Sequence, residues 1–410
     1  MTGIGAAEAA ARLGVKRETL YAYVSRGQLT RDRGSGGRGS GGRESVFDSS
    51  EVDALAARTR RGGRAGSLEV VVASGITSLE GDRLRYRGRD ATELAASASF
   101  EAVAEFLWTG DADVLSRRPR WPAAESGVGL SGDVDPINRF RVGVATAAAA
   151  DALRYDLEPR AVAAAGRRAV TAMVAALPAM RPVRARPVRA GPVRARSVRE
   201  RSVAARLWSG LTPMAPSAGH VAALDAALVL LADHELAIST LAARVAASAR
   251  ADPYSVVSTG LGVVAGGLHG GAGRPVVALL EEVAEPGRAA GVIGERLRLG
   301  QRLPGLGHLV YRERDPRAAA LLPTVAGLRL VPGRWAVVEA VLALIEERLD
   351  SLVNIDFALG ALVYGAGMRA EATEAIFAVA RTAGWLAHAV EEYSEAPLRF
   401  RPRAAYTGPR

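Results

Sequence analysis

Apolar residues recur at intervals of three and four along five long stretches of this chain, and this period favours a fold built mainly from helices. Much of the apolar content is alanine, which favours helix formation and lets neighbouring helices pack closely. Only Arg83–Tyr86 and residues 68–72 are predicted as short strands in this part, so we expect a mainly α protein. The five helical stretches are residues 92–108, 138–153, 220–249, 334–349 and 371–393.

The composition excludes several classes of protein and site. With no cysteine, the chain can form neither a disulfide nor a thiolate zinc site. The N-terminal sequence MTGIGAAEAAARLG lacks the basic and apolar parts of a signal peptide. No uncharged apolar stretch reaches the length of about 18 residues that a membrane-spanning helix needs. We therefore expect a cytoplasmic protein that does not cross a membrane.

The net charge of +10 is concentrated in two segments. Residues 1–64 carry 12 Lys/Arg against 7 Asp/Glu, a net +5, and residues 181–205 carry 8 Arg against one Glu, a net +7. The other residues together therefore carry −2. Because the body of the protein is close to neutral, the chain as a whole is not expected to be a nucleic-acid-binding surface.

The first basic segment has the pattern of a small DNA-binding domain. Residues 6–13 and 16–25 have helical spacing and are separated by one tight turn. The phrase AAEAAARLGVKRETLYAYVSRGQL resembles the winged helix-turn-helix of the MerR and excisionase group, which would place such a domain at 1–58, with a wing at 33–43. A protein-interaction module on the same scaffold is the alternative. The candidate DNA contacts are Lys16, Arg17, Thr19 and Tyr21.

The second basic segment is a repeat of period five, RPVRA-RPVRA-GPVRA-RSVRE-RSVAA, at residues 181–205. Its prolines prevent a regular helix, and a period of five fits neither helix nor strand. We predict a disordered, solvent-exposed insertion, either a tolerated expansion of a surface loop or a segment that contacts phosphates by charge.

Three of the five histidines lie in segments that suggest a ligand site. His234 lies in the sequence ADHE, expected on a helix, whereas His269 and His308 lie in the glycine-rich sequences GGLHGGA and PGLGH. Glycine lets the backbone approach a ligand closely, although each histidine alone could equally be structural. No metal site is expected, because no histidine pair has ligand spacing.

One aspartate and several arginines complete the candidate site. Asp356 lies between Ile355 and Phe357, where burial would raise the pKa of its carboxyl group and suit it to act as a general base. Pairing with a structural arginine is the alternative. Arginines from separate parts of the chain could converge on the carboxylates of a di- or tricarboxylate ligand.

Five motifs, in this order along the chain, resemble the successive motifs of the citrate synthase family: ADHELAISTLAARVAAS, GGLHGGA, PGLGHLVYRERDPRA, NIDFALGAL and ARTAGWLAH. The stretch ITSLEGDRLRYRGRDATELAASASFEAVAEFLWTG resembles the N-terminal segment of that family. The resemblance implies an acyltransferase that condenses acetyl-CoA with oxaloacetate and then hydrolyses the thioester, without a cofactor.

The resemblance also assigns roles by motif. Asp356 would remove a methyl proton from acetyl-CoA, His269 would stabilise the enol, and His308 would protonate the ketone of oxaloacetate. Four residues would bind carboxylates, with the last reaching into the neighbouring subunit of a homodimer: His234, Arg317, Arg381 and Arg401. The contacts to CoA would come from Leu303, Pro304, Gly305, Leu306 and Gly307.

The family fold would consist of a large helical domain, residues 68–270 and 365–410, and a smaller mobile helical domain, residues 271–364, preceded by a linker at 59–67. His220 is expected to begin a helix and His388 to be structural. Two alternatives stay open: a 2-methylcitrate synthase that uses propionyl-CoA, and a DNA-binding regulator whose citrate-synthase-like domain senses a ligand.

Overall fold

A computed structural model describes residues 3–13, 15, 20, 24, 29–33, 45–53, 71–122, 124, 130, 132–178, 180, 202–349, 351–401 and 408. The chain divides into two compact units, Met1–Ala73 and Ser74–Arg410, and each is described by itself. Among the described residues, no helix is both long and apolar enough to cross a membrane.

The described residues of the first unit include a helix and a three-stranded antiparallel sheet in the order β1-β3-β2. Its elements are β1 (Gly3–Gly5), α1 (Ala6–Leu13), β2 (Arg31–Arg33) and β3 (Ser45–Asp48). Ile4, Leu20 and Phe47 are among the residues of its small core. The predicted helix at 6–13 is confirmed. The second helix of the predicted helix-turn-helix lies mostly outside the described residues, as do the candidate DNA contacts Lys16, Arg17, Thr19 and Tyr21.

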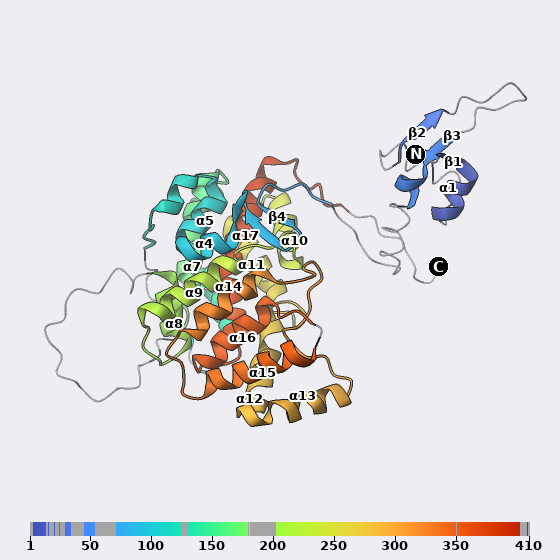
Figure 1. Ribbon diagram of the computed structural model, residues 1–410. Helices are drawn as coiled ribbons and strands as arrows, with labels where there is room; N and C mark the ends of the chain where they lie inside the picture. Colours follow the sequence, from blue (N-terminus) through green and yellow to red (C-terminus); the bar gives the residue numbers. More distant parts are fainter. Residues whose placement is uncertain are drawn as a thin grey trace, which may run out of the picture. The chain divides into compact units, whose positions relative to one another are not determined.

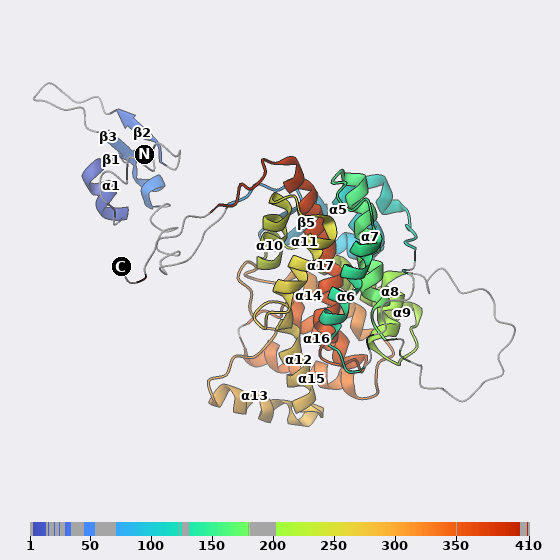
Figure 2. The ribbon, with the colours of Figure 1, turned by 180° about the vertical axis from the view of Figure 1, so that it is seen from behind.

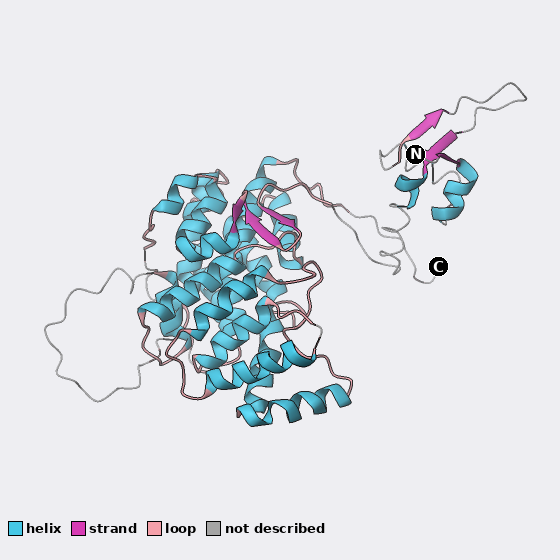
Figure 3. Ribbon diagram, viewed as in Figure 1, coloured by secondary structure: helices cyan, strands magenta, loops and turns pink. Residues whose placement is uncertain are grey.

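The second unit is a body of helices with one small sheet, β4-β5-β6 (Figures 1 and 3). The strands are β4 (Thr77–Glu80), β5 (Arg83–Tyr86) and β6 (Arg89–Asp90). The helices are α4 (Ala91–Ser97), α5 (Phe100–Thr109), α6 (Pro136–Ala150), α7 (Pro159–Ala175), α8 (Val203–Leu211), α9 (Ala218–Leu231), α10 (Ile238–Ser248), α11 (Pro253–Val264), α12 (Arg274–Val283), α13 (Ala289–Arg298), α14 (Pro316–Ala326), α15 (Arg334–Arg348), α16 (Ile355–Gly365) and α17 (Ala372–Ser394). Short 3-10 helices lie at η1 (Ala112–Ser116), η3 (Gly270–Gly273) and η4 (Pro286–Arg288).

Helix α17, with 23 residues, forms the centre of this unit and packs against α5, α7, α9, α10 and α11 (Figure 2). Small residues allow the close approach. A Cβ atom at Gly260 of α11 would lie 2.5 Å from the Trp385 ring of α17, and one at Gly166 of α7 would lie 2.9 Å from the Trp108 ring. The predicted helix at 371–393 is therefore confirmed as the core of the fold.

Two of the predicted helices are each divided in the structure. Residues 92–108 form α4 and α5, because the Ser99 hydroxyl caps a new helix by accepting a hydrogen bond from the Ala102 amide. Residues 220–249 form α9 and α10, and the chain leaves the helix between them, where Glu235 has a φ of 51°. The prediction that His234 lies on a helix is therefore wrong.

The strand predictions are partly correct. Arg83–Tyr86 forms β5, but Val71 and Val72 lie in no strand, and residues 68–70 lie outside the described residues. β5 pairs with Thr77–Glu80 on one side, with Thr77 opposite Tyr86, and with β6 on the other.

The predicted disordered insertion is wrong at its C-terminal end. Ser202 caps α8, and Val203 and Ala204 are fully buried in the first turn of that helix. The last repeat, RSVAA, lacks proline, so nothing prevents a helix from starting there. Residues 181–201 lie outside the described residues.

Candidate active site

Two loops bring three aromatic side chains together. His234 lies between α9 and α10, whereas His308 and Tyr311 lie in the loop before α14. The ring centroids of His234 and His308 are 5.3 Å apart, and the Tyr311 hydroxyl lies 3.0 Å from Nε2 of His234. Tyr311 was not predicted as a site residue, although it lies within the motif that contains His308.

Arg317, in the first turn of α14, lies beside this cluster. It is 3% exposed, and its Nη2 atom is 3.2 Å from Nε2 of His308. The backbone amides of Val310 and Tyr311 both donate to Nδ1 of His308, at 3.1 and 3.3 Å. These donors place the proton of a neutral His308 on Nε2. Two hydrogen-bond donors therefore lie next to each other, an arrangement suited to one acceptor oxygen that both donors can reach.

Asp315 holds Arg317 in position and was missed in the sequence. Its carboxylate is fully buried, pairs with the Arg317 guanidinium at 2.9 Å and caps α14. It also accepts a hydrogen bond from the Ile355 amide at 2.9 Å, which joins the start of α14 to the start of α16. An aspartate before Pro316 is the pattern of a helix N-cap, so that part of its role could have been found.

Asp356 lies in the first turn of α16, beside the arginines. Asn354 caps this helix and accepts from the Asp356 amide at 3.0 Å. Burial raises the pKa of the Asp356 carboxyl group, and the positive charges of Arg317 and Arg381 oppose that rise in part. A carboxylate in such a setting is a stronger base than an exposed one.

Arg381 of α17 lies close enough to His234 and Asp356 for its charge to act on both. It is 2% exposed, donates from Nε to the Leu231 carbonyl at 2.9 Å and lies over the Phe377 ring. Among the described residues it forms no salt bridge, so a buried cation faces the site without a carboxylate bonded to it. Such a group favours an anionic ligand.

His269 lies at the end of the connection between α11 and η3, with its ring edge toward Phe377. Its Nε2 atom is 2.7 Å from the Ser239 hydroxyl, which accepts a hydrogen bond from the Trp385 indole at 3.2 Å. Ser239 can then donate to Nε2, which favours a proton on Nδ1 of His269. The network therefore leaves the Nδ1–H group available as a donor.

All three candidate histidines are neutral near pH 7. Burial and then the charge of Arg381 lower the pKa of His269 to about 4. Burial and then the charge of Arg317 lower the pKa values of both His308 and His234. Neutral imidazoles between buried arginines can donate hydrogen bonds to a developing oxyanion.

The predicted CoA-contacting segment is attached to the start of α16. Gly305 and Gly307 have positive φ values of 77° and 74°. The Asn354 amide donates to the Gly305 carbonyl at 3.0 Å, and the Asn354 side chain donates to the Gly307 carbonyl at 2.8 Å. A Cβ atom at Gly305 would lie 2.7 Å from Cβ of Phe357, so this turn packs directly beside Asp356.

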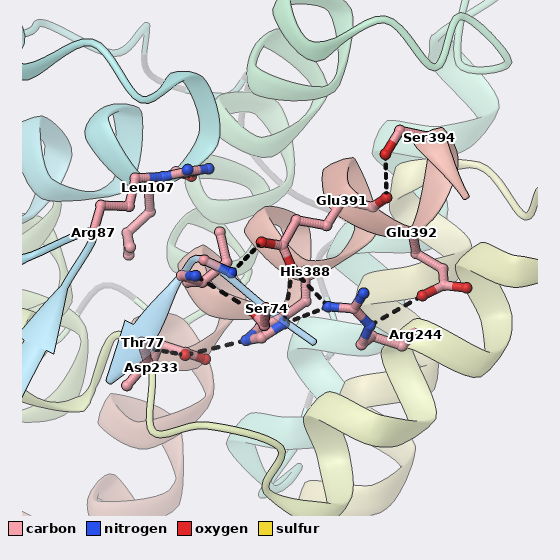
Figure 4. Close-up of polar contacts among 12 residues, drawn as sticks. Ser74, Thr77, Arg87, Leu107, Asp233, Arg244, His388, Glu391, Glu392 and Ser394 are labelled. Atoms are coloured by element: carbon pink, nitrogen blue, oxygen red, sulfur yellow. Dashed lines mark hydrogen bonds and ion pairs between the residues drawn. The ribbon is translucent and has the colours of Figure 1, made fainter. Parts of the chain in front are cut away.

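A second buried network involves Asp233, the residue before His234 in the sequence (Figure 4). The Asp233 carboxylate accepts from the Thr77 hydroxyl at 2.5 Å and lies 3.2 Å from Nε2 of His388. Nδ1 of His388 lies 2.9 Å from Arg244, which pairs with Glu391 and Glu392. His388 thus has the contacts of a structural residue, as predicted. His220, predicted to begin a helix, lies in the first turn of α9, which begins at Ala218, and forms a capping box with Ser217.

Arg401 stands apart from these residues. It is exposed, beyond the end of α17, and within the described part of the chain it does not contact the other candidate site residues.

Comparisons with known proteins identify the family of this chain. Residues 67–403 match the family described as "Citrate synthase, C-terminal domain". The chain is 32% identical over 368 residues to Citrate synthase 2 of Bacillus subtilis, covering 83% of this chain and 95% of that protein. It is 27% identical over 374 residues to 2-methylcitrate synthase of Shewanella oneidensis, covering 88% and 96%. The crystal structure of citrate synthase from Thermotoga maritima matches with a TM-score of 0.64 and 25% identity, covering 83% of this chain and 94% of that one. This chain therefore belongs to the citrate synthase family of acyltransferases.

Proposed function

We propose that this family member is a citrate synthase, which converts acetyl-CoA, oxaloacetate and water into citrate and CoA. The observation that carries the proposal is the adjacent pair of donors, Nε2–H of His308 and Nη2 of Arg317, 3.2 Å apart beside a carboxylate whose pKa is raised. A keto acid supplies the acceptor that such a pair needs.

The first step forms a carbon nucleophile. Asp356 takes a proton from the methyl group of acetyl-CoA, and the electron pair of that C–H bond moves toward the thioester oxygen. The Nδ1–H group of His269 donates a hydrogen bond to this oxygen and stabilises the enol. The neutral His269 keeps its Nδ1 proton and acts as a hydrogen-bond donor to this oxygen.

The second step forms the new carbon–carbon bond. The enol carbon attacks the ketone carbon of oxaloacetate, and the ketone oxygen takes the proton from Nε2 of His308. Arg317 and Arg381 hold the carboxylates, and His234 adds a further contact. Water then cleaves the thioester to release citrate and CoA.

A thiol-release assay tests this proposal. Wild-type protein with acetyl-CoA and oxaloacetate is expected to release CoA, and omission of oxaloacetate should abolish the release. No release with either acetyl-CoA or propionyl-CoA would contradict the proposed function.

The acyl donor has a second candidate. The similarity to a 2-methylcitrate synthase over almost the full length of both chains favours propionyl-CoA as the alternative. A comparison of kcat/KM for the two donors decides between them, and a clear propionyl preference would replace acetyl-CoA in the proposal.

We further propose that the enzyme is a homodimer in which the exposed Arg401 reaches the site of the partner, and that residues 303–307 contact CoA. The smaller domain would be residues 271–364, most of which form α12 to α16, at one end of the unit in Figure 1. Its closure over oxaloacetate would exclude water from the reacting groups.

A DNA-binding regulator is the candidate from another class, favoured by the net charge of +5 on residues 1–64. The regulator would be supported if the protein released no CoA and bound DNA sequence-selectively. This DNA binding should weaken steeply as the salt concentration rises.

A further inference from the structure

The β4–β5 hairpin contacts both loops of the candidate site. Near its open end, the Thr77 hydroxyl donates to the Asp233 carboxylate at 2.5 Å. The fully buried Tyr86 hydroxyl lies 3.0 Å from the Val229 carbonyl and 3.1 Å from the Asp233 carbonyl. The hairpin is therefore fixed to the segment that leads directly into His234.

At its tip, the same hairpin contacts the other loop. The Asp82 carboxylate accepts hydrogen bonds from three consecutive backbone amides, those of Arg312 at 3.2 Å, Glu313 at 3.2 Å and Arg314 at 2.9 Å. These amides lie between Tyr311 and Asp315, so the contact holds the middle of the segment whose two ends carry His308 and Arg317.

We propose that Asp82 is a positioning residue that holds residues 308–317 against the His234 loop, so that His308 and Tyr311 stay in register with His234. The hairpin then links two loops about 75 residues apart in sequence, and Asp82 is its contact with the second of them. The kinetic part of this inference rests on the proposed function, whereas the structural part does not.

The contact has the chemistry of a fixed anchor. The three donors converge on one ionised carboxylate, and hydrogen bonds to a charged acceptor are stronger than those between neutral groups. Partial burial acts to raise the pKa of Asp82, but the three amides hold that pKa below its ordinary value. Because every donor is a backbone group, side-chain changes at 312–314 preserve the contact, and Asp82 is the position to test.

Hydrogen exchange measures the contact directly. In Asp82→Ala, the amides of residues 312–314 should exchange at least about 10-fold faster than in wild type. Asp82→Asn retains one acceptor oxygen and should give an intermediate rate. Glu80→Gln is the matched control, because it weakens the exposed ion pair with Arg85 in the same hairpin without touching these amides.

Kinetics measures the consequence. Asp82→Ala should raise KM for oxaloacetate and lower kcat, together reducing kcat/KM about 10-fold, with partial rescue in Asp82→Asn. The thermal midpoint of Asp82→Ala should be similar to that of Glu80→Gln, which would show that the loss of activity is not caused by unfolding.

The outcomes separate the two proposals. If the amides of residues 312–314 exchange at the wild-type rate in Asp82→Ala, the positioning role of Asp82 is wrong. Faster exchange of these amides with unchanged kinetics in an active enzyme would also contradict it. A wild-type protein without CoA release would instead remove the proposed function, and exchange would still report on the anchor.

Discussion

Nε2 of His308 lies 3.2 Å from Nη2 of Arg317. Because two backbone amides donate to Nδ1 of His308, the proton of the neutral ring is on Nε2, and the guanidinium nitrogen is always a donor. Arg317 is in turn fixed by the fully buried Asp315. A pair of donors held at this separation is poised for an oxygen acceptor, and the residues around it can be tested one at a time.

Replacement of Arg381 should weaken oxaloacetate binding. Arg381→Lys removes the planar donor set from a buried position, and KM for oxaloacetate should rise about 10- to 100-fold, the scale of one hydrogen bond to a charged group. Steady-state kinetics measures the change. Arg334→Lys is the control, since Arg334 also lies over an aromatic ring, that of Tyr364, and donates to a backbone carbonyl. An equal effect in both variants would contradict a ligand role for Arg381.

Ser239→Ala should affect the chemical step more than binding. Loss of the hydroxyl removes the partner that favours the Nδ1–H form of His269, and kcat should fall about 10-fold with little change in KM for oxaloacetate. Ser248→Ala, a buried serine of the same helix whose hydroxyl bonds to the Val245 carbonyl, is the control. If the activity of both variants falls in proportion to the fall in their thermal midpoints, the effect of Ser239→Ala is structural only.

Activity should decrease at low pH because Asp356 must be ionised to act as a base. Its pKa is raised by burial, so kcat/KM should fall as the pH drops through a value above the ordinary aspartate pKa of about 3.9. A pH–rate profile measures this limb, with circular dichroism at each pH to separate titration from unfolding. A profile that stays flat down to the ordinary aspartate range would contradict the assignment.

Asp225 should make the fold less stable as the pH rises. Burial, and then repulsion from Glu101, raises the pKa of Asp225 to about 7. Between about pH 4 and about pH 7 the folded state therefore binds more protons than the unfolded state, and the free energy of unfolding falls with increasing pH. Asp225→Asn should remove this fall, which is about 4 kcal/mol for a pKa difference of about three units, as measured by urea unfolding. Asp111→Asn, at the exposed cap of η1, should leave the slope unchanged.

Two inactive variants should restore activity when mixed, if Arg401 completes the partner's site. Refolding equal amounts of Arg401→Ala and Asp356→Ala together should give about a quarter of wild-type activity, because half of the dimers are mixed and each mixed dimer holds one intact site. No recovery, with mixed dimers demonstrated by mass, would place Arg401 in its own subunit's site or outside both.

The sequence predicted the helices better than the contacts between them. Nearly every side chain of α17 is buried, so residues 371–393 carry the apolar pattern that predicted this helix. The break before α10 was missed because residues 228–232 continue an apolar helical pattern. At the break, Asp233 accepts a hydrogen bond from Thr77, which lies far away in the sequence. Long-range contacts of this kind override local helix propensity and cannot be predicted from a local pattern.

The candidate site divides in the same way. Family motifs predicted His234, His308 and Arg317, and the structure brings these three together. Two supporting residues depend on contacts between different elements: Asp315 also accepts from the Ile355 amide, and Ser239 contacts His269. Asp82 offered no signal, since an acidic residue in a Gly-Asp turn is common on any protein surface.

The close contact of Gly260 with Trp385 has a consequence for how this enzyme can vary. The indole pressed by α11 is the same indole that donates to Ser239, and Ser239 is the partner of His269. Any side chain at position 260 would displace the ring and disturb the hydroxyl that sets the proton on the imidazole. Overpacking at this point would thus affect the imidazole as well as the stability of the fold.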